Sequence, residues 1–272
     1  MIGCHDNQSP HAPCFTWFAA RLGAARRRAF PMTHTRTRIK ICGITREQDL
    51  DAAVAAGADA VGFVLYAKSP RYVTAERAGQ LARRLPPFVT PVLLFVNEDI
   101  DAIAAACAQV PGALLQFHGD ETPEACSAIA ARVHRPFMRA ARIPLEGSAV
   151  FDLVEFASHY AAAQAILLDA HVDGYGGGGK TFNWSRLPPS VNSHLVLSGG
   201  LTPANVTDGI LQLRPRGLSL AVDISSGVEI SKGIKDADKI HQFVAAVRAA
   251  DRQLAEKHSH VQFTSPAGLP TA

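Results

Sequence analysis

The chain has 272 residues, 47% of them hydrophobic, which is enough to bury either two small domains or one large barrel. Its 27 basic and 24 acidic residues give a formal charge of +3, but residues 1–31 hold four arginines and one aspartate, so the remainder holds 23 of each. A neutral body gives no electrostatic reason to expect nucleic acid or a membrane surface as a partner.

The two ends of the chain differ from its middle. Residues 1–35 are predicted to be a disordered extension, residues 36–256 a folded domain, and residues 257–272 a disordered tail. Two alternatives for the extension are a metal cluster and an arginine-rich transit peptide. The first would draw on the following residues: Cys4, His5, His11 and Cys14. The N-terminus lacks the apolar core of a signal peptide.

The five cysteines form no C-x-x-C pair and are odd in number, so they indicate neither a disulfide framework nor a zinc knuckle. A reducing, cytoplasmic location is therefore expected. No apolar run approaches the ~18 residues that a membrane-spanning helix requires.

From Arg38 onward, short apolar runs alternate with helical patterns. Several of the runs are almost continuously apolar, as expected for parallel strands that are covered on both faces. The predicted strands are residues 39–42, 60–65, 91–96, 113–118, 136–143, 165–170, 194–199 and 218–224.

Helix starts are predicted between these strands. Thr45 and Gln48 have the spacing of a capping box. Thr122-Pro123 and Thr202-Pro203 each place a capping oxygen before a proline in the first helical position. Asp236 precedes apolar residues at helical spacing.

Repeated strand-then-helix units place the chain in the α/β class, and eight of them predict a single parallel eight-stranded (β/α)8 TIM barrel. Eight tilted parallel strands with helical crossovers can close without an exposed edge. The rival is an open doubly wound sheet, but its G-x-G-x-x-G turn is not found after the first strand, where Cys42-Gly43-Ile44-Thr45 stands.

In such a barrel, side chains at the carboxyl ends of the strands share one rim and can meet around one substrate. The polar and glycine residues predicted at that rim are Cys42, Lys68, Arg71, Asn97, Gln116, His118, Arg139, Arg142, Asp169, Ser198, Gly199, Gly200 and residues 223–229.

Nine segments in order along the chain resemble the phosphoribosylanthranilate isomerase family of tryptophan biosynthesis. Together they span the chain outside its two tails. They are KICGIT (40–45), GADAVGFVL (57–65), SPRYV (69–73), FVN (95–97), LQFHG (115–119), LLDA (167–170), GGGGKTFNW (176–184), LSGGL (197–201) and VDISSGVE (222–229).

The resemblance implies an Amadori rearrangement of N-(5-phosphoribosyl)anthranilate to 1-(2-carboxyphenylamino)-1-deoxyribulose 5-phosphate. An acid must release the ring oxygen, and a base must take the proton from C2′. Ring opening yields an iminium that stabilises charge at the neighbouring carbon, so neither a metal nor another cofactor is expected. The only implied partner is this small phosphoribosyl substrate, and the protein would be a monomer or a homodimer.

By the same resemblance, Cys42 is the general base and Asp169 the general acid. A free thiol has a pKa of about 8.5, so a positive field beside Cys42 would enlarge its thiolate fraction at neutral pH. Asp169 has the opposite need, because a carboxyl that donates must be kept protonated by its surroundings.

Substrate-binding roles are also implied by the resemblance. Arg71 is expected to meet the anthranilate carboxylate, which suits a forked cation. Asp223 would orient the aminobenzoate part, and His118 is either a substrate contact or a hydrogen-bonded core residue. The residues expected at the phosphate are Gly199, Gly200, Ser225, Ser226 and Gly227.

Residues 173–184 form a glycine-rich segment expected to close over the sugar as a lid. Most relatives carry Ser or Thr where this chain has Gly178, which should loosen the lid. Two alternatives to the function remain. One is the histidine-pathway isomerase, which places an aspartate where Cys42 stands, and the other is a barrel that binds a phosphate ligand without catalysis.

Overall fold

The computed structural model describes residues 36–145, 151–171 and 181–263. The predicted extension, with its alternative metal cluster, lies outside the described residues. So do residues 264–272 and most of the predicted lid, including Gly178.

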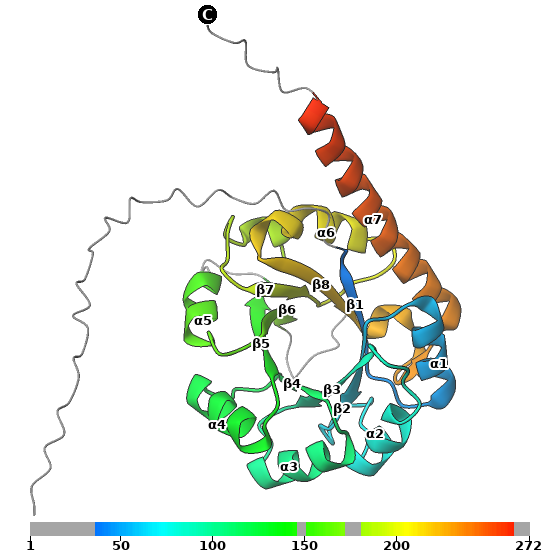
Figure 1. The fold of residues 1–272 in the computed structure, drawn as a ribbon, viewed down its shortest axis with the longest axis vertical. Helices are drawn as coiled ribbons and strands as arrows, with labels where there is room; N and C mark the ends of the chain where they lie inside the picture. The colour runs from blue at the N-terminus through cyan, green and yellow to red at the C-terminus, as the bar shows by residue number, and fades with distance from the viewer. Residues whose placement is uncertain (1–35, 146–150, 172–180, 264–272) are drawn as a thin grey trace, which may run out of the picture. The chain divides into compact units, whose positions relative to one another are not determined.

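Eight parallel strands form a closed barrel in which each strand pairs with the next and β1 pairs with β8 (Figure 1). The predicted (β/α)8 TIM barrel is thereby confirmed. The strands are β1 (Arg38–Cys42), β2 (Ala60–Val64), β3 (Thr90–Phe95), β4 (Leu114–Phe117), β5 (Phe137–Pro144), β6 (Ala165–His171), β7 (His194–Leu197) and β8 (Ser219–Ile224).

Helices surround this barrel (Figure 1). They are α1 (Glu47–Ala56), α2 (Ala75–Ala82), α3 (Ile100–Gln109), α4 (Pro123–Val133), α5 (Leu153–His159), α6 (Val206–Leu213) and α7 (Ala237–Phe263). Three 3₁₀ helices are η1 (Trp184–Arg186), η2 (Arg214–Arg216) and η3 (Ser226–Val228).

Two details of the connections differ from a regular repeat. Between β6 and β7, the described residues hold only the single turn η1. Pro188 and Pro189 follow it, and prolines there remove the backbone donors that a longer helix would need. After β8, a small antiparallel hairpin forms from β9 (Glu229–Ser231) and β10 (Ile234–Lys235), which the sequence did not predict.

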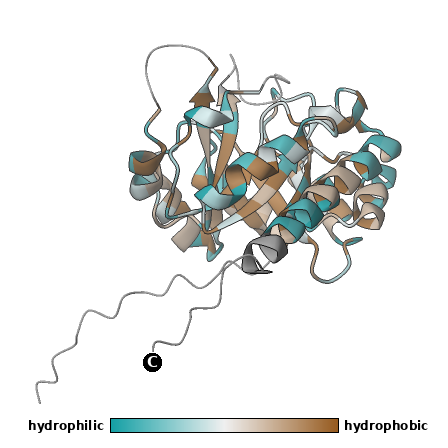
Figure 2. Cartoon of the chain, turned by 90° about the horizontal axis from the view of Figure 1, so that it is seen from above, coloured by the Kyte–Doolittle hydropathy of each residue, from teal (hydrophilic) through white to brown (hydrophobic). Residues whose placement is uncertain are grey.

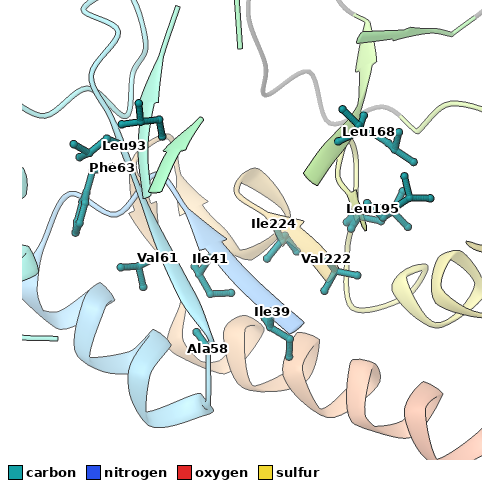
Figure 3. Close-up of a cluster of buried hydrophobic side chains, with 14 of the residues drawn as sticks. Ile39, Ile41, Ala58, Val61, Phe63, Leu93, Leu168, Leu195, Val222 and Ile224 are labelled. Atoms are coloured by element: carbon teal, nitrogen blue, oxygen red, sulfur yellow. The ribbon is translucent and has the colours of Figure 1, made fainter. Parts of the chain in front are cut away.

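Alternate side chains of each strand face opposite sides of the barrel wall. On β1, Ile39 and Ile41 belong to the main apolar core, which also includes residues of the surrounding helices (Figure 3). Cys42 belongs instead to a separate apolar cluster with Val64, Leu94 and Val96 inside the barrel. In Figure 2 the strands are largely hydrophobic, whereas the surrounding helices mix hydrophilic and hydrophobic residues.

The predicted helix starts are only partly confirmed. Thr122 caps α4 by accepting from the backbone of Ala125, and Asp236 accepts from the backbone of Lys239 at the start of α7. Thr45 does not cap α1, because its hydroxyl donates to the carbonyl of Gly233. Thr202 lies in a turn that precedes α6 rather than at its first residue.

The last helix also extends farther than expected. Helix α7 runs to Phe263, past residue 257, where the sequence predicted the chain to become disordered. Among the described residues, no helix is long and apolar enough to cross a membrane.

Candidate active site

Strand β1 places two polar side chains inside the barrel, Lys40 and Cys42, which are 4% and 5% exposed. Lys40 Nζ lies 2.8 Å from Asp223 Oδ1 on β8. On the other side, Cys42 pairs in register with Gly62 of β2. A Cβ atom at Gly62 would stand 2.7 Å from Cys42 Sγ and 3.0 Å from Lys40 Nζ. The missing side chain of this glycine therefore leaves the space into which the thiol and the ammonium both project.

The ionisation of Cys42 is governed by two opposing effects. Burial raises the pKa of its thiol, and the positive charge of Lys40 works against that rise without cancelling it. Burial alone would lower the pKa of Lys40, but the charges of Asp223 and of the Cys42 thiolate outweigh it and raise the pKa. Lys40 thus supplies positive charge beside the thiol, and its own ammonium stays charged at neutral pH.

Asp169 on β6 is buried and hydrogen-bonded through both of its oxygens. Its Oδ1 accepts from the backbone N–H of Ala170, and its Oδ2 lies 3.0 Å from His118 Nε2. His118 Nδ1 in turn lies 3.0 Å from Gln116 Nε2. Because an amide nitrogen only donates, this geometry assigns the ring proton to Nε2, which donates to Asp169. The described structure thus brings His118 into direct contact with the predicted acid.

Contacts across β6, β7, β8 and β1 join Asp169 to Cys42. A Cβ atom at Gly199, just after β7, would stand 2.9 Å from Asp169 Oδ1. The neighbouring Ser198 hydroxyl donates to Asp223 Oδ2 at 3.3 Å. Asp223 then holds the lysine ammonium beside the thiol. The two predicted catalytic side chains therefore lie at the same, carboxyl end of the barrel, with Gly199, Ser198, Asp223 and Lys40 between them.

The glycine turns after β7 and β8 pack against each other. Gly199 and Gly200 have φ angles of +77° and +63°, which favour glycine. A Cβ atom at Gly227 would stand 2.0 Å from the carbonyl oxygen of Leu201, so only glycine permits this approach. No acceptor among the described residues engages the backbone amides of Gly199, Gly200, Ser226 and Gly227. Free amides of this kind can bind an anion.

Ser225 differs from its neighbours in this loop. Its hydroxyl donates to the carbonyl oxygen of Cys42 at 3.0 Å and accepts from Lys235 Nζ at 3.2 Å. The side chain therefore fastens the end of β8 to the end of β1. Its hydroxyl is engaged by these two partners, and the expected contact of Ser225 with the phosphate stays a prediction.

Arg71 lies in the loop after β2 and is held by Glu229 of β9. Its Nε and Nη2 donate to the two carboxylate oxygens, each at 2.8 Å. Both side chains are buried. The guanidinium stem also lies across the turn after Cys42, since a Cβ atom at Gly43 would stand 2.5 Å from Arg71 Cδ. Glu229 thus binds one edge of the Arg71 guanidinium, and Nη1 on the opposite edge has no partner among the described residues.

A second buried cation completes this group. Lys235 Nζ lies 2.9 Å from Glu229 Oε1. Burial by itself would raise the pKa of Glu229, but hydrogen bonds and charge from Arg71 and Lys235 outweigh burial and lower the pKa. Two cations therefore share one carboxylate. The excess positive charge suits an anionic group of a ligand.

Three members of this site were missed at the sequence level: Lys40, Gly62 and Lys235. Lys40 could have been found, because it lies two residues before Cys42 and therefore shares its face of the strand. Gly62 could have been found, because a glycine inside an apolar strand often marks a close approach of another group. Nothing local marks Lys235 as a partner of Glu229. Among the described residues, no group of three or more His, Cys, Asp and Glu side chains is arranged to hold a metal ion.

Comparison with known proteins agrees with this geometry. Residues 39–246 match a family model described as N-(5′-phosphoribosyl)anthranilate (PRA) isomerase. The N-(5′-phosphoribosyl)anthranilate isomerase of Methylibium petroleiphilum is 61% identical over 220 residues, which cover 81% of this chain and 98% of that protein.

Two solved structures are similar as well. One is a phosphoribosylanthranilate isomerase in complex with reduced 1-(o-carboxyphenylamino)-1-deoxyribulose 5-phosphate, with a TM-score of 0.63, 38% identity, and coverage of 78% of this chain and 99% of that one. The other is a monomer generated from the dimeric enzyme of Thermotoga maritima, with a TM-score of 0.62, 37% identity and the same coverage. The chain therefore belongs to the phosphoribosylanthranilate isomerase family.

Proposed function

We propose that this chain isomerises N-(5-phosphoribosyl)anthranilate to 1-(2-carboxyphenylamino)-1-deoxyribulose 5-phosphate in tryptophan biosynthesis. The observation that carries the proposal is that Cys42, the last residue of β1, and Asp169, near the end of β6, lie at the same end of the barrel with Ser198, Asp223 and Lys40 between them. A barrel that only bound phosphate would require neither side chain. The histidine-pathway alternative would require an aspartate in place of Cys42.

The chemistry divides between these two residues. Asp169, in its protonated form, gives its proton to the ring oxygen as the C1′–O bond breaks, which leaves an iminium at C1′. The Cys42 thiolate then removes the proton from C2′, and the electron pair of the C–H bond neutralises the iminium as an enolamine. Tautomerisation of the enolamine to the ketone moves the O2′ proton to C1′, and exchange with solvent returns a proton to Asp169 and takes one from Cys42, so no atom is gained or lost overall. Each positioned acid or base contributes about 10² to 10⁴ in rate.

The remaining residues of the site would hold the two ends of the substrate. The free amides of Gly199, Gly200, Ser226 and Gly227 would bind the phosphate. Nη1 of Arg71 would bind the anthranilate carboxylate while Glu229 holds the opposite edge of the guanidinium.

Asp223 and His118 would act closer to the reacting carbons. Asp223 already accepts from Lys40 and Ser198, and a carboxylate has room for a further donor, such as the anilino N–H of the substrate. His118 would orient Asp169 through its Nε2 proton.

Assembly and location complete the proposal. The Thermotoga maritima relative is described as dimeric, which supports a homodimer over the monomer as the state to test first, by light scattering. The free thiols of Cys42, Cys107 and Cys126 support a cytoplasmic location, where thiols stay reduced.

The activity is tested by mixing the purified protein with freshly made phosphoribosylanthranilate and following the loss of substrate fluorescence. The proposal predicts decay well above the spontaneous rate, together with formation of the ketose product. Decay at the spontaneous rate, with folded protein at high concentration, would exclude the proposed activity.

A further inference from the structure

We propose that Lys40 is a positioning residue for this reaction, which controls how readily Cys42 ionises and acts on the substrate only through that sulfur. The inference rests on the proposed role of Cys42 as the base. Neither the comparison with relatives nor the expected acid-base pair assigns Lys40 a part.

The position of Lys40 is fixed from two sides. Its ammonium is buried inside the barrel and bonded to Asp223 Oδ1, while Asp223 Oδ2 accepts from Ser198. The ion pair and the burial thus hold the ammonium on the same face of β1 as the thiol.

Gly62 explains how the ammonium and the thiol can be neighbours. Lys40 and Cys42 are two residues apart on one strand, so their side chains leave the same face of β1. A side chain on the paired strand would normally fill the space beside them. At Gly62, any Cβ atom would approach both Cys42 Sγ and Lys40 Nζ to 3.0 Å or less. The glycine thus leaves the sulfur and the nitrogen facing one common space.

The apolar surroundings of Cys42 make the ionisation of its thiol depend on a nearby cation. The thiol packs with Val64, Leu94 and Val96, with the ring of Tyr66 against the same cluster. Apolar neighbours of this kind disfavour a thiolate. A nearby positive charge opposes this effect and enlarges the thiolate fraction that can accept the C2′ proton.

Four charged groups act on this sulfur, and they come from four different segments. They are Lys40 on β1, Asp223 on β8, Lys235 on β10 and Arg71 after β2. Asp223 opposes a thiolate, and Lys40 is the cation whose ammonium borders the same space beside Gly62 as the sulfur. Lys40 is therefore the cation best placed to stabilise the thiolate.

The first test is a titration of the Cys42 thiol, measured as ultraviolet thiolate absorbance against the Cys42→Ala protein. Lys40→Met is expected to raise the thiol pKa by about one unit or more, which lowers the thiolate fraction at neutral pH about tenfold. The double variant Lys40→Met/Asp223→Asn gives the same direction without leaving Asp223 as an unpaired buried charge. Lys40→Arg keeps the charge and should restore most of the thiolate.

A matched control is Lys235→Met, which removes another buried lysine from the same end of the barrel. Its effect on the thiol titration should be clearly smaller, since Lys235 does not border the space beside Gly62 that the sulfur faces and is the weaker of the two charges on the thiol. An unchanged thiol titration in folded Lys40→Met, or an equal change in Lys235→Met, would overturn the inference.

Kinetics distinguish this inference from the proposed function. In Lys40→Met, the rising limb of kcat against pH should move to higher pH with the thiol, so that kcat recovers in alkali while KM stays nearly constant. A loss of kcat that is equal at every pH would indicate a merely structural role for Lys40 and would also overturn the inference. A thiol titration that shifts while the rate profile stays in place would instead contradict the role of Cys42 as the base.

If the Lys40 variants do not fold, Gly62→Ala provides an independent test. It keeps both charges but places a methyl group between the sulfur and the ammonium. The thiol pKa should rise in this variant as well. A folded Gly62→Ala protein with an unchanged thiol titration would contradict the inference.

Discussion

The two strands that carry the proposed base and acid end in different surroundings. At the end of β1, Cys42 lies beside the buried ion pair of Lys40 and Asp223. At the end of β6, Asp169 is bonded to the ring of His118 and to a backbone amide. The sulfur is thus controlled by charge, whereas the carboxyl is controlled by hydrogen bonds that fix its direction.

Because of this difference, substitutions near β1 and substitutions near β6 should affect different kinetic properties. A change among the charges near β1 should alter the pH at which the enzyme works, because a neighbouring charge changes how easily the thiol ionises. A change among the hydrogen bonds near β6 should alter the maximal rate with less effect on that pH. The comparison fails if both sides respond in the same way.

The largest effects are expected when either reacting group is removed. Cys42→Ala and Asp169→Asn should each lower kcat by about 10² to 10⁴, because each deletes one positioned base or acid. Affinity for the phosphate end of the substrate should stay nearly intact, as measured by inorganic phosphate or a product analogue in calorimetry. If Cys42→Ala kept full activity, the thiol would only fill space in the apolar cluster.

The next largest effect is expected at Arg71. Arg71→Lys keeps a positive charge but loses the fork that binds Glu229 on one edge and the substrate carboxylate on the other. KM should rise about 10- to 100-fold with a smaller change in kcat, as steady-state kinetics would show.

An exposed arginine supplies the control for this change. Arg84→Lys, which alters a solvent-exposed ion pair with Asp51, should leave KM unchanged. An unchanged KM in Arg71→Lys would remove the arginine from the substrate site.

A smaller effect is expected at His118. His118→Asn should lower kcat by about tenfold or less, because Asp169 loses one of its two hydrogen-bond donors but keeps the backbone N–H of Ala170. The rising limb of the rate profile should stay where it is, in contrast to Lys40→Met. If the rising limb of kcat against pH shifted in His118→Asn, the β1 and β6 sides of the site would not be controlled separately.

The last effect concerns stability and not catalysis. Because the pKa of Glu229 is lowered in the folded state, its contribution is fully present above its unfolded pKa and is lost as the pH falls through the folded pKa. Urea unfolding should therefore show wild type more stable than Glu229→Gln by about 2 kcal/mol at neutral pH. The difference should shrink below about pH 4.3.

Glu47 provides a matched control for this measurement. It binds Arg77 through both carboxylate oxygens as Glu229 binds Arg71, but it lies at the surface. Glu47→Gln should change the free energy of unfolding little at any pH, because solvent screens exposed pairs. An equally large, pH-dependent loss in both variants would contradict the importance of burial.

The barrel was predictable because each strand is an apolar run, and apolar runs at this repeat favour parallel strands covered by helices. Helix starts were less predictable, because a capping residue type does not show which backbone group its oxygen will meet. Thr45 has the right spacing for a cap, yet its hydroxyl reaches Gly233 in a distant hairpin. Only the folded chain brings those two residues together.

The site residues also divide into those that the sequence predicted and those that only the folded chain reveals. Cys42 and Asp169 were predictable from their motifs and from the rule that strand ends share one rim. Lys40 was not singled out, since a lysine in a strand is usually solvated, and its ion pair spans 183 residues of sequence. The ion pair between Arg71 and Glu229 joins residues 158 positions apart, so the sequence could not predict it either.

Cys42 and Asp169 are proposed to act on one sugar skeleton from opposite sides. A crystal structure of this protein with reduced 1-(o-carboxyphenylamino)-1-deoxyribulose 5-phosphate bound would show this directly. Cys42 Sγ is expected within about 4 Å of C2′ and an Asp169 carboxyl oxygen within about 3 Å of the oxygen that derives from the ring. A bound analogue that touches only one of the two side chains, or that has both on one face, would contradict this proposal.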